Sequence, residues 1–286
     1  MPDLLRKVQT KVRKAIVYAP IAVGRALLIR SYPPSNWGDA LSPVLAQEIS
    51  GLPTVNINDA PNPLHRPVYS LTGSILGWAM KGNAADHVIW GSGFFDASET
   101  LKGVPGRICA VRGPLTRARI LELGVECPEI FGDPALLYPR FYQPSVSQEY
   151  ALGIIPHIAD QDSAWVRAAA TQPNVKIIDV TLGVQNFVDD LLKCHAIASS
   201  SLHGIIAADA YGIPSVWIEL SDRVWGAGFK FRDYFASVHK PITQAVVVEP
   251  STTVTELVDQ VYSGGIEIDL DHLMAACPLP TKRANT

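Results

Sequence analysis

The 286-residue chain is 48% hydrophobic and only 18% charged, a composition that excludes an intrinsically disordered protein. Its formal net charge of −3 argues against a nucleic-acid-binding protein that relies on a basic surface. The length accommodates one large α/β domain or two smaller ones, each with its own hydrophobic core. The four cysteines are widely spaced and form no C-x-x-C pair, which fits a protein of the reducing cytosol.

The N-terminal segment differs from the rest of the chain. Residues 1–30 contain seven Lys or Arg and one acid, and within residues 4–16 apolar side chains recur at helical spacing between the basic ones. Such a segment either lies on an anionic membrane surface or docks on the body of the protein, and the sequence leaves both open. No run approaches the roughly 20 apolar residues that span a bilayer. We therefore expect a cytoplasmic protein with, at most, peripheral contact with the inner face of the cell membrane through residues 1–30.

From residue 26 the chain alternates short β-rich apolar runs with helical stretches, which is typical of a parallel α/β architecture. In the first half we expect strands at 26–32, 67–72, 87–90 and 107–111, and helices at 40–49 and 114–124. After a proline-containing linker at 138–145, we expect strands at 151–156, 175–180, 196–199, 215–219 and 245–248, and helices at 163–170, 184–194, 204–211 and 253–262.

This pattern predicts two Rossmann-like lobes with parallel sheets that face a cleft, as in glycosyltransferase-B enzymes. The predicted organisation is a basic amphipathic segment at 1–25, an N-terminal acceptor-side lobe at 26–140, a C-terminal donor-side lobe at 146–265 and a C-terminal tail at 266–286. Residues 278–286 at the end of this tail are expected to be polar.

The segment from Ser199 to Pro214 is the strongest candidate for a ligand site. A predicted strand ends at its serines and a helix begins near His203, and ligands of open α/β sheets bind at such carboxyl ends of strands. Backbone N–H groups at the helix start would bind an anion, and Gly204 would let it approach closely. His203 could then act as a general acid or base. The same residues could instead cap the helix and pack, and this pattern alone leaves the choice open.

Seven motifs in chain order give the segment its context. Ser199-x-x-Leu202-His203-Gly204, followed by an Ala-rich helix and Gly-Ile-Pro, resembles the C-terminal motif of the polysaccharide pyruvyl transferase family. The other motifs that resemble the family are Asn36-Trp37-Gly38-Asp39, Gly73-Ser74-Ile75-Leu76, Arg112-Gly113-Pro114-Leu115-Thr116, Gly132-Asp133-Pro134-Ala135, Ile155-Pro156-His157 and Lys230-Phe231-Arg232-Asp233-Tyr234. They look similar to members that pyruvylate bacterial exopolysaccharides such as succinoglycan.

The resemblance implies an activity and its substrates. Pyruvate would pass from phosphoenolpyruvate to two hydroxyls of a sugar, in an exopolysaccharide or its lipid-linked precursor, with a cyclic ketal and phosphate as products. Phosphoenolpyruvate would be a co-substrate, and we expect no cofactor. We also expect no metal, because no H-E-x-x-H or similar ligand spacing occurs. The G-x-G-x-x-G, P-loop and G-x-S-x-G signatures are also absent from the sequence.

The chemistry of the donor assigns roles to these residues. Protonation of the enol carbon C3 needs an acid, for which we expect His203, and the attacking hydroxyls need a base, for which we expect Asp39 or Asp133. A donor with a carboxylate and a phosphate needs cations and backbone donors. The expected donor-binding residues are Arg112, Ser200, Ser201, Gly204, Lys230 and Arg232. The expected acceptor-binding residues are Asn36, Trp37, Gly38 and His157, and Trp37, Trp90 or Trp225 could stack on a sugar face or belong to the core.

One position departs from the family pattern. Many members have Arg just before the Leu-His of the C-terminal motif, where this chain has Ser201. If that Arg binds the donor in relatives, another cation must replace it here. Arg112 is the first candidate, and Lys230 or Arg232 is the next. Two alternatives stay open. Two-lobed glycosyltransferases that use a nucleotide sugar also place a helix start and a Gly-x-Pro loop at the donor phosphates. Ser201 supports the other alternative, a glycan-binding relative without catalytic activity.

Overall fold

The protein contains two parallel β-sheets of five strands each, seen in a computed structural model that describes residues 19–32, 36–59, 62–80, 82–224 and 226–282. The N-terminal sheet has the order β2 (Thr54–Asn56), β1 (Leu27–Ile29), β3 (Val68–Ser70), β4 (His87–Trp90) and β5 (Arg107–Ala110). The C-terminal sheet has the order β10 (Val246–Val247), β9 (Ser215–Glu219), β8 (Ile197–Ser199), β6 (Leu152–Ile155) and β7 (Val175–Ile177). The predicted α/β fold with two parallel sheets is confirmed; the comparison with glycosyltransferase-B enzymes stays a prediction.

The two sheets share one topology. Counted within its own lobe, each sheet has the strand order 2-1-3-4-5, the order of doubly wound folds. In such a sheet the chain changes direction between the first and third strands, and ligands bind outside the carboxyl ends of that pair. The pairs are β1 and β3 in the N-terminal lobe, and β6 and β8 in the C-terminal lobe.

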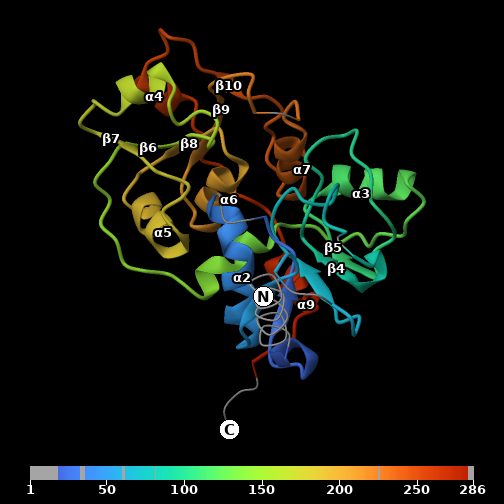
Figure 1. The fold of residues 1–286 in the computed structure, drawn as a ribbon. Helices are drawn as coiled ribbons and strands as arrows, with labels where there is room; N and C mark the ends of the chain where they lie inside the picture. Colours follow the sequence, from blue (N-terminus) through green and yellow to red (C-terminus); the bar gives the residue numbers. More distant parts are fainter. Residues whose placement is uncertain (1–18, 33–35, 60–61, 81, 225, 283–286) are drawn as a thin grey trace, which may run out of the picture.

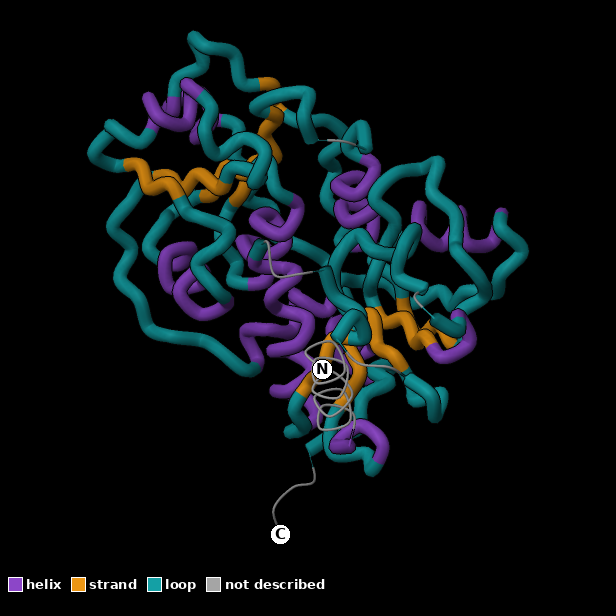
Figure 2. The backbone as a smooth tube through the Cα atoms, in the orientation of Figure 1, coloured by secondary structure: helices purple, strands orange, loops and turns teal. Residues whose placement is uncertain are grey.

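Helices cover both faces of each sheet (Figures 1 and 2). In the C-terminal lobe, α4 (Ala164–Ala169) and α8 (Val254–Asp259) pack on one face, and α5 (Val184–Leu192) and α6 (Leu202–Ala210) on the other. In the N-terminal lobe, α3 (Pro114–Glu122) packs on one face, while α2 (Trp37–Ser50), the 3-10 helix η2 (Pro134–Arg140) and α9 (Leu270–Ala275) lie on the other. A second 3-10 helix, η1 (Ala84–Asp86), precedes β4, and α7 (Phe229–Ser237) lies beside α3.

Local sequence explains where these elements form and stop. The three residues of β1 and the four of β6 are all buried, as expected of parallel strands that are covered on both faces. The helix α2 begins at Asn36, whose side chain accepts a hydrogen bond from the Asp39 amide, and ends at Gly51 in the left-handed conformation with φ of 71°. A capping box between Thr253 and Glu256 opens α8.

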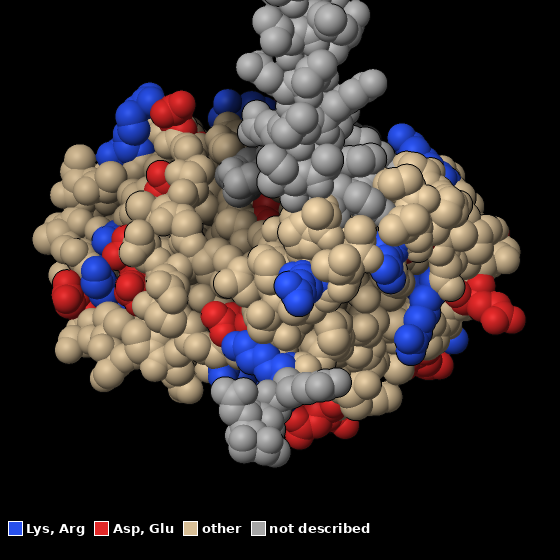
Figure 3. Space-filling view, turned by 60° about the horizontal axis from the view of Figure 1, so that its bottom comes forward, with Lys and Arg blue, Asp and Glu red and all other residues tan. Residues whose placement is uncertain are grey.

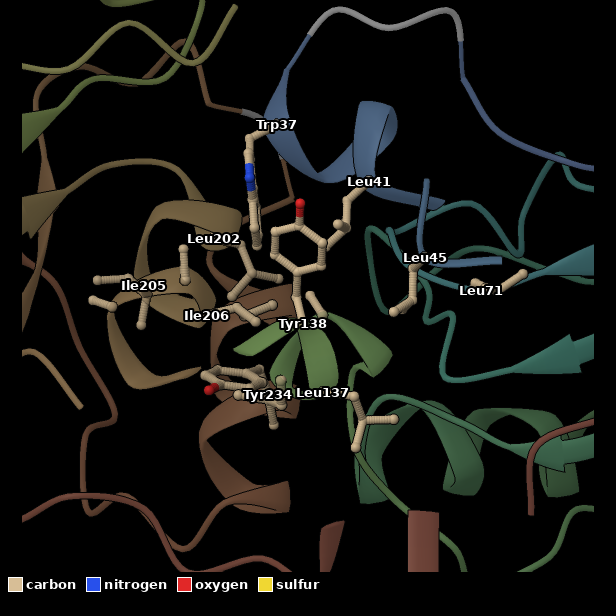
Figure 4. Close-up of a cluster of buried hydrophobic side chains, with 14 of the residues drawn as sticks. Trp37, Leu41, Leu45, Leu71, Leu137, Tyr138, Leu202, Ile205, Ile206 and Tyr234 are labelled. Carbon is tan, nitrogen blue, oxygen red and sulfur yellow. The ribbon is translucent and has the colours of Figure 1, made fainter. Parts of the chain in front are cut away.

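The lobes are joined by one continuous apolar core. Trp37 and Leu41 of α2, Tyr138 of η2, Ile205 of α6 and Tyr234 of α7 all belong to it. Figure 4 shows these side chains converging from the N-terminal half, the connecting segment and the C-terminal half of the chain. Because burial of apolar area is the main stabilising contribution to folding, this shared core holds the two lobes against each other.

The C-terminal tail expected at 266–286 contains a helix and buried side chains. Residues 270–275 form α9, and Leu273 and Leu279 are buried. The carbonyl of Leu273 accepts a hydrogen bond of 3.0 Å from the Trp90 indole, and the Lys282 amide donates to the Ile49 carbonyl over 3.0 Å. The C-terminal segment thus returns to the N-terminal lobe, and its amphipathic pattern is too short to stand out in the sequence.

The elements β2, η1 and α7 were not predicted from the sequence either, and the structure predicted for the 138–145 segment was wrong. β2 has only three residues, and α7 follows a run of glycines and aromatic residues without helical periodicity. The linker expected at 138–145 begins inside η2, which Pro134 and Pro139 hold in a 3-10 conformation.

No helix in the described part of the chain is long and apolar enough to cross a membrane. On the face drawn in Figure 3, the described Lys and Arg side chains are interspersed with Asp and Glu. The basic segment expected to contact membranes lies mostly in residues 1–18, outside the described residues, so that expectation stays a prediction.

Candidate functional site

A cavity of about 380 Å³ lies where the direction-reversal points of the two sheets face each other. Its lining comes from both lobes and follows the carboxyl ends of strands. Tyr32 comes after β1 and Ser74 after β3, while His157 comes after β6 and Ser201 after β8. Each sheet therefore places its ligand-binding edge at the same cavity, as doubly wound topology predicts.

The N-terminal wall combines a polar pair with aromatic side chains. Asn36 and Asp39 line the cavity at the start of α2, where the Asn36 amide donates to the Asp39 carboxylate over 2.5 Å. Tyr32 and Trp78 meet edge to face with ring centroids 5.4 Å apart. The side chain of Tyr32 is exposed and that of Trp78 half-buried, so this wall offers aromatic surface beside a carboxylate.

The C-terminal wall is the start of α6. Ser201, Leu202 and His203 line the cavity, and Ser201 occupies the N-cap position without a side-chain capping bond. The first N–H groups of an α-helix have no partner within the helix, and the helix dipole is positive at this end. The start of this nine-residue helix is therefore suited to an anionic group.

His203 is held in an unusual environment. Its imidazole ring packs directly on Gly38 of α2, so closely that a Cβ atom on Gly38 would lie 2.1 Å from Nδ1 of the ring. Its Nε2 atom is buried and has no hydrogen-bond partner among the described residues. Burial, together with the charges of Lys230 and Arg112, lowers the pKa of His203 to about 3. The ring is consequently neutral at pH 7 in the absence of a ligand.

His157 lines the same cavity in a fixed orientation. Its Nδ1 atom accepts a 3.2 Å hydrogen bond from the Ala159 amide, so the neutral ring carries its proton on Nε2. Its own backbone amide donates to the Ser200 hydroxyl over 2.8 Å. Burial and the charge of Lys230 lower the pKa of His157 to about 4, so this imidazole is also neutral at pH 7.

Lys230 supplies the cavity with positive charge. Its stem is buried, and its ammonium lies 4.2 Å from the centre of the Phe95 ring. Burial and Arg112 lower the pKa of Lys230 to about 8, while Asp39 opposes this shift. Among the described residues, none forms an ion pair with Lys230. The described residues also contain no group of three His, Cys, Asp or Glu side chains that could hold a metal ion. Lys230 thus offers a charge that a bound anion can use.

Comparison with known proteins shows that part of the chain resembles a known family. Residues 88–222 match the family model described as polysaccharide pyruvyl transferase. The resemblance to that family is confirmed. The matched stretch contains the Arg112, Asp133, His157 and His203 motifs, whereas Asn36–Asp39 and Lys230 lie outside it.

The sequences of two curated proteins align with about three-fifths of this chain. One is the uncharacterized protein L143 of Acanthamoeba polyphaga mimivirus, 30% identical over 179 residues that make up 60% of each chain. The other is the succinoglycan biosynthesis protein ExoV of Rhizobium meliloti, 28% identical over 185 residues, which are 60% of this chain and 55% of that protein. The match therefore spans little more than half the length of these relatives.

A solved structure is similar at lower identity. The functionally uncharacterized protein KP1_0663 of Klebsiella pneumoniae is 14% identical and has a TM-score of 0.47, over 82% of this chain and 98% of that one.

The fold brings about half of the predicted family site residues to the cavity. His203, Asp39, Asn36, His157, Ser201 and Lys230 all line it. These residues come from four separate motifs of the family, and the longest separation along the chain is from Asn36 to Lys230. Their functions remain predictions, but their convergence on one cavity is a property of the fold.

Three predicted contact residues lie in the interior instead. Trp37 packs against Phe187, with ring centroids 5.3 Å apart, and its indole donates to the Val184 carbonyl, so it belongs to the core rather than to an acceptor site. Asp133 is fully buried as the N-cap of η2, and burial raises its pKa to about 6. Arg112 is fully buried and bonded to Asp233, so it lies behind the cavity wall.

Four further residues predicted for the site do not line the cavity. Ser200 is buried and bonded to Asp160 rather than open to a donor. Gly204 gives room to the Ser199 hydroxyl, which a Cβ would meet at 2.3 Å, and not to a ligand. Arg232 donates to the Ala227 carbonyl away from the cavity. Gly38 is buried beneath His203, so it accommodates a catalytic candidate instead of a sugar.

The remaining lining residues were not predicted. Ser74 belongs to the Gly73–Leu76 motif, to which no function was assigned from the sequence. Tyr32 and Val180 are the last residues of predicted strands, and this position could have marked them as cavity residues. Trp78 and Phe95 lie in irregular segments, and no sequence signal marks them. Of the three tryptophans considered for sugar stacking, Trp90 is fully buried and Trp225 lies outside the described residues.

Proposed function

We propose that this protein transfers pyruvate from phosphoenolpyruvate to two hydroxyls of a sugar, forming a cyclic ketal and releasing phosphate. The observation that carries the proposal is the convergence of His203, Lys230 and the start of α6 on one cavity within a chain that resembles pyruvyl transferases. The name of ExoV, a succinoglycan biosynthesis protein, supports an exopolysaccharide or its lipid-linked precursor as the acceptor.

The donor's charges match the C-terminal side of the cavity. In our proposal the phosphate lies at the start of α6, where backbone N–H groups and the Ser201 hydroxyl donate to its oxygens. The ammonium of Lys230 pairs with the phosphate or the carboxylate. Lys230 thereby takes the place of the Arg that many family members have at the position of Ser201.

The reaction then needs one proton at carbon and a route for two hydroxyl protons. His203, protonated in the donor complex, delivers a proton to C3, and C2 becomes an oxocarbenium-like centre. The first sugar hydroxyl attacks C2 and passes its proton to Asp39. The C2–O bond to phosphate then breaks, the second hydroxyl attacks, and its proton leaves with the phosphate. Asp39 releases its proton to solvent, and His203 regains one proton from solvent when the next donor binds. The net change is one diol and one phosphoenolpyruvate converted to one ketal and one phosphate.

The acceptor lies on the N-terminal side in this proposal. Trp78 and Tyr32 present aromatic surface on the same wall as Asp39, and the apolar face of a pyranose stacks on such rings. The carboxylate of Asp39 would accept hydrogen bonds from the hydroxyls while the ring is held. This replaces Trp37, which the fold assigns to the core, as the stacking residue.

The proposal is tested by phosphate release. Purified protein with phosphoenolpyruvate and a panel of lipid-linked oligosaccharides should release phosphate, and the product should gain a pyruvyl ketal by mass spectrometry. If UDP- or GDP-sugars stabilise the protein against heat and phosphoenolpyruvate does not, the chain is a glycosyltransferase. If oligosaccharides bind but no donor reacts, it is a glycan-binding protein.

Replacement of Lys230 by methionine should weaken donor binding. Methionine keeps the apolar stem beside Phe95 and removes the charge, and an ionic hydrogen bond contributes about 1.5–3 kcal/mol. We expect the KM for phosphoenolpyruvate to rise roughly 10- to 100-fold, with the KM for the acceptor unchanged. Lys193→Met, which removes a lysine paired with Asp190 on the outside of α5, is the control. An unchanged donor KM in Lys230→Met would place the donor elsewhere.

Replacement of Trp78 by alanine should weaken acceptor binding. Loss of the stacking surface is expected to raise the KM for the acceptor roughly tenfold, leave the KM for phosphoenolpyruvate unchanged, and be largely reversed in Trp78→Phe. Trp165→Ala is the matched control, because that indole is also half-buried but lies in the C-terminal lobe, bonded to the Thr252 carbonyl. If Trp78→Ala and Trp165→Ala raised the KM for the acceptor equally, Trp78 would contribute only to the stability of the fold.

A further inference from the structure

The helix α7 belongs to the C-terminal half of the chain but lies against the N-terminal lobe, beside α3 (Figure 1). Its first turn carries Lys230, which lines the cavity, and one turn later it carries Asp233, which is fully buried. Side chains at i and i+3 of a helix lie on neighbouring faces. Whatever holds Asp233 therefore also fixes the position and direction of Lys230.

Asp233 is held by two residues of the N-terminal lobe. Its Oδ2 atom accepts a hydrogen bond of 2.9 Å from Nε of Arg112 and another of 2.7 Å from the Thr116 hydroxyl. Its Oδ1 atom accepts a 2.8 Å bond from the Thr116 backbone amide. The side chains of Arg112 and Asp233 have no exposed surface, so this ion pair is not weakened by solvent. We call Arg112, Thr116 and Asp233 the interlobe latch.

Arg112 extends the latch to two further loops. Its NH1 group donates to the Ser74 hydroxyl over 2.5 Å, after β3, and its NH2 group donates to the Phe94 carbonyl over 2.6 Å, after β4. The three guanidinium nitrogens are thus all engaged in fixed bonds. Gly113 is required beside them, because a Cβ there would lie 2.0 Å from the Asp233 carbonyl oxygen.

The turn that leads into α7 needs such support. Gly226, Ala227 and Gly228 all have positive φ, of 98°, 43° and 73°. For Ala227 the left-handed conformation costs about 1–2 kcal/mol, and strained backbone of this kind persists only where the surroundings fix it. Asp233 follows this turn in α7, and its bonds to Arg112 and Thr116 provide contacts that do so.

We propose that the interlobe latch positions Lys230 in the cavity, so that Asp233 is a positioning residue and Arg112 acts through the latch instead of binding the donor. The charged and titratable groups around Lys230 are Arg112 beyond β5, Asp39 of α2, His203 of α6 and His157 after β6. The inference uses only the geometry of the protein, so it stands or falls separately from the proposed function.

The reactivity of Lys230 with an amine-acylating reagent, followed by mass spectrometry as a function of pH, tests this. In the native protein the labelling midpoint should lie near the pKa of about 8 that burial and Arg112 give Lys230. In Asp233→Asn the pKa of a freed Lys230 should move toward the ordinary lysine value of 10.5. We expect the labelling midpoint to rise by one unit or more, which leaves at least about fivefold less neutral amine at pH 8.

The direction of the shift separates positioning from simple electrostatics. If Lys230 kept its place, loss of the Asp233 charge would leave Arg112 uncompensated and lower the midpoint. An unchanged or lowered midpoint in folded Asp233→Asn would therefore overturn the proposal. Thr116→Val removes the hydroxyl bond without changing charge, so it should also raise the midpoint, and it provides the test if Asp233→Asn does not fold.

The matched control is Asp209→Asn. Asp209 is also a buried carboxylate in an ion pair, with Lys240, and it also bonds α7, through the Tyr234 hydroxyl over 2.9 Å. Its pair does not line the cavity. This variant should lose thermal stability while the Lys230 midpoint stays near 8, and a rise equal to that of Asp233→Asn would mean that any loosening of α7 has the same effect.

Discussion

Replacing His203 by glutamine is expected to lower kcat for pyruvyl transfer by roughly 10²- to 10⁴-fold, the usual contribution of a positioned general acid. Glutamine fills much of the space of the imidazole and can still donate a hydrogen bond, but it cannot deliver a proton to carbon. The KM for phosphoenolpyruvate should change little, because Lys230 and the start of α6 are intact. Steady-state kinetics of phosphate release measure both constants.

The protonation state of His203 gives this prediction a second part. The pKa of about 3 means that the imidazole is neutral in the free protein, where Lys230 and Arg112 oppose its charge. A bound phosphate and carboxylate reverse that field, so donor binding should raise the pKa and take up a proton. The wild-type rate should fall as the pH rises above the raised pKa, and this limb of the profile should be absent in His203→Gln. Calorimetry in buffers of different ionisation enthalpy measures the proton uptake directly.

Stability provides a readout that needs no substrate. The pKa of His203 lies below the ordinary value of 6.5, so the folded state favours the neutral ring while the unfolded chain takes up a proton. The contribution of the neutral ring is full above pH 6.5 and is lost as the pH falls from 6.5 toward 3. The free energy of unfolding of His203→Gln should therefore fall less steeply than that of the wild type as the pH decreases through this window. An equally steep loss, together with normal kcat, would remove His203 from both roles.

The sequence predicted the sheets well and the site in part, for different physical reasons. Buried parallel strands such as 87–90 and 215–219 are continuous apolar runs, and both were found with their observed bounds. Residues such as Asp39 and His203 were found because they follow strand ends in motifs. In contrast, α9 and β2 are short, and tertiary packing decides such elements more than local propensity does.

Charged residues in the motifs were the least reliable guide to which side chains line the cavity. A polar or basic residue in a motif was expected to touch ligand, yet Arg112 and Asp133 are fully buried and Arg232 faces away from the cavity. The sequence does not say which carboxylate a cation meets, and the partner of Arg112 is 121 residues away. A motif residue can therefore be required by the fold around a site without lining it.

Gly38 illustrates the same principle, and its substitution should produce the second large effect. Gly38 is a helical residue of α2 without positive φ, so alanine should fit its backbone and favour the helix by up to about 1 kcal/mol. The obstacle is His203, whose Nδ1, Cε1 and Cγ atoms would lie 2.1–2.2 Å from the new Cβ. The ring must move, and we expect kcat to fall by roughly 10²-fold or more, because a misplacement of about 1 Å has effects of that size.

A double-mutant cycle shows whether the clash is the cause. Gly38→Ala alone should destabilise the protein by roughly 1–3 kcal/mol, the usual cost of overpacking. In the His203→Ala background the space is empty, so the same substitution should be neutral or stabilising, and the coupling between the two sites should exceed about 1 kcal/mol. Additive effects on the free energy of unfolding would mean that Gly38 is required for another reason. A strong coupling would show that the Asn36–Asp39 motif and the Leu202–His203 motif, from opposite lobes, act as one unit, with the glycine of the first shaped to receive the histidine of the second.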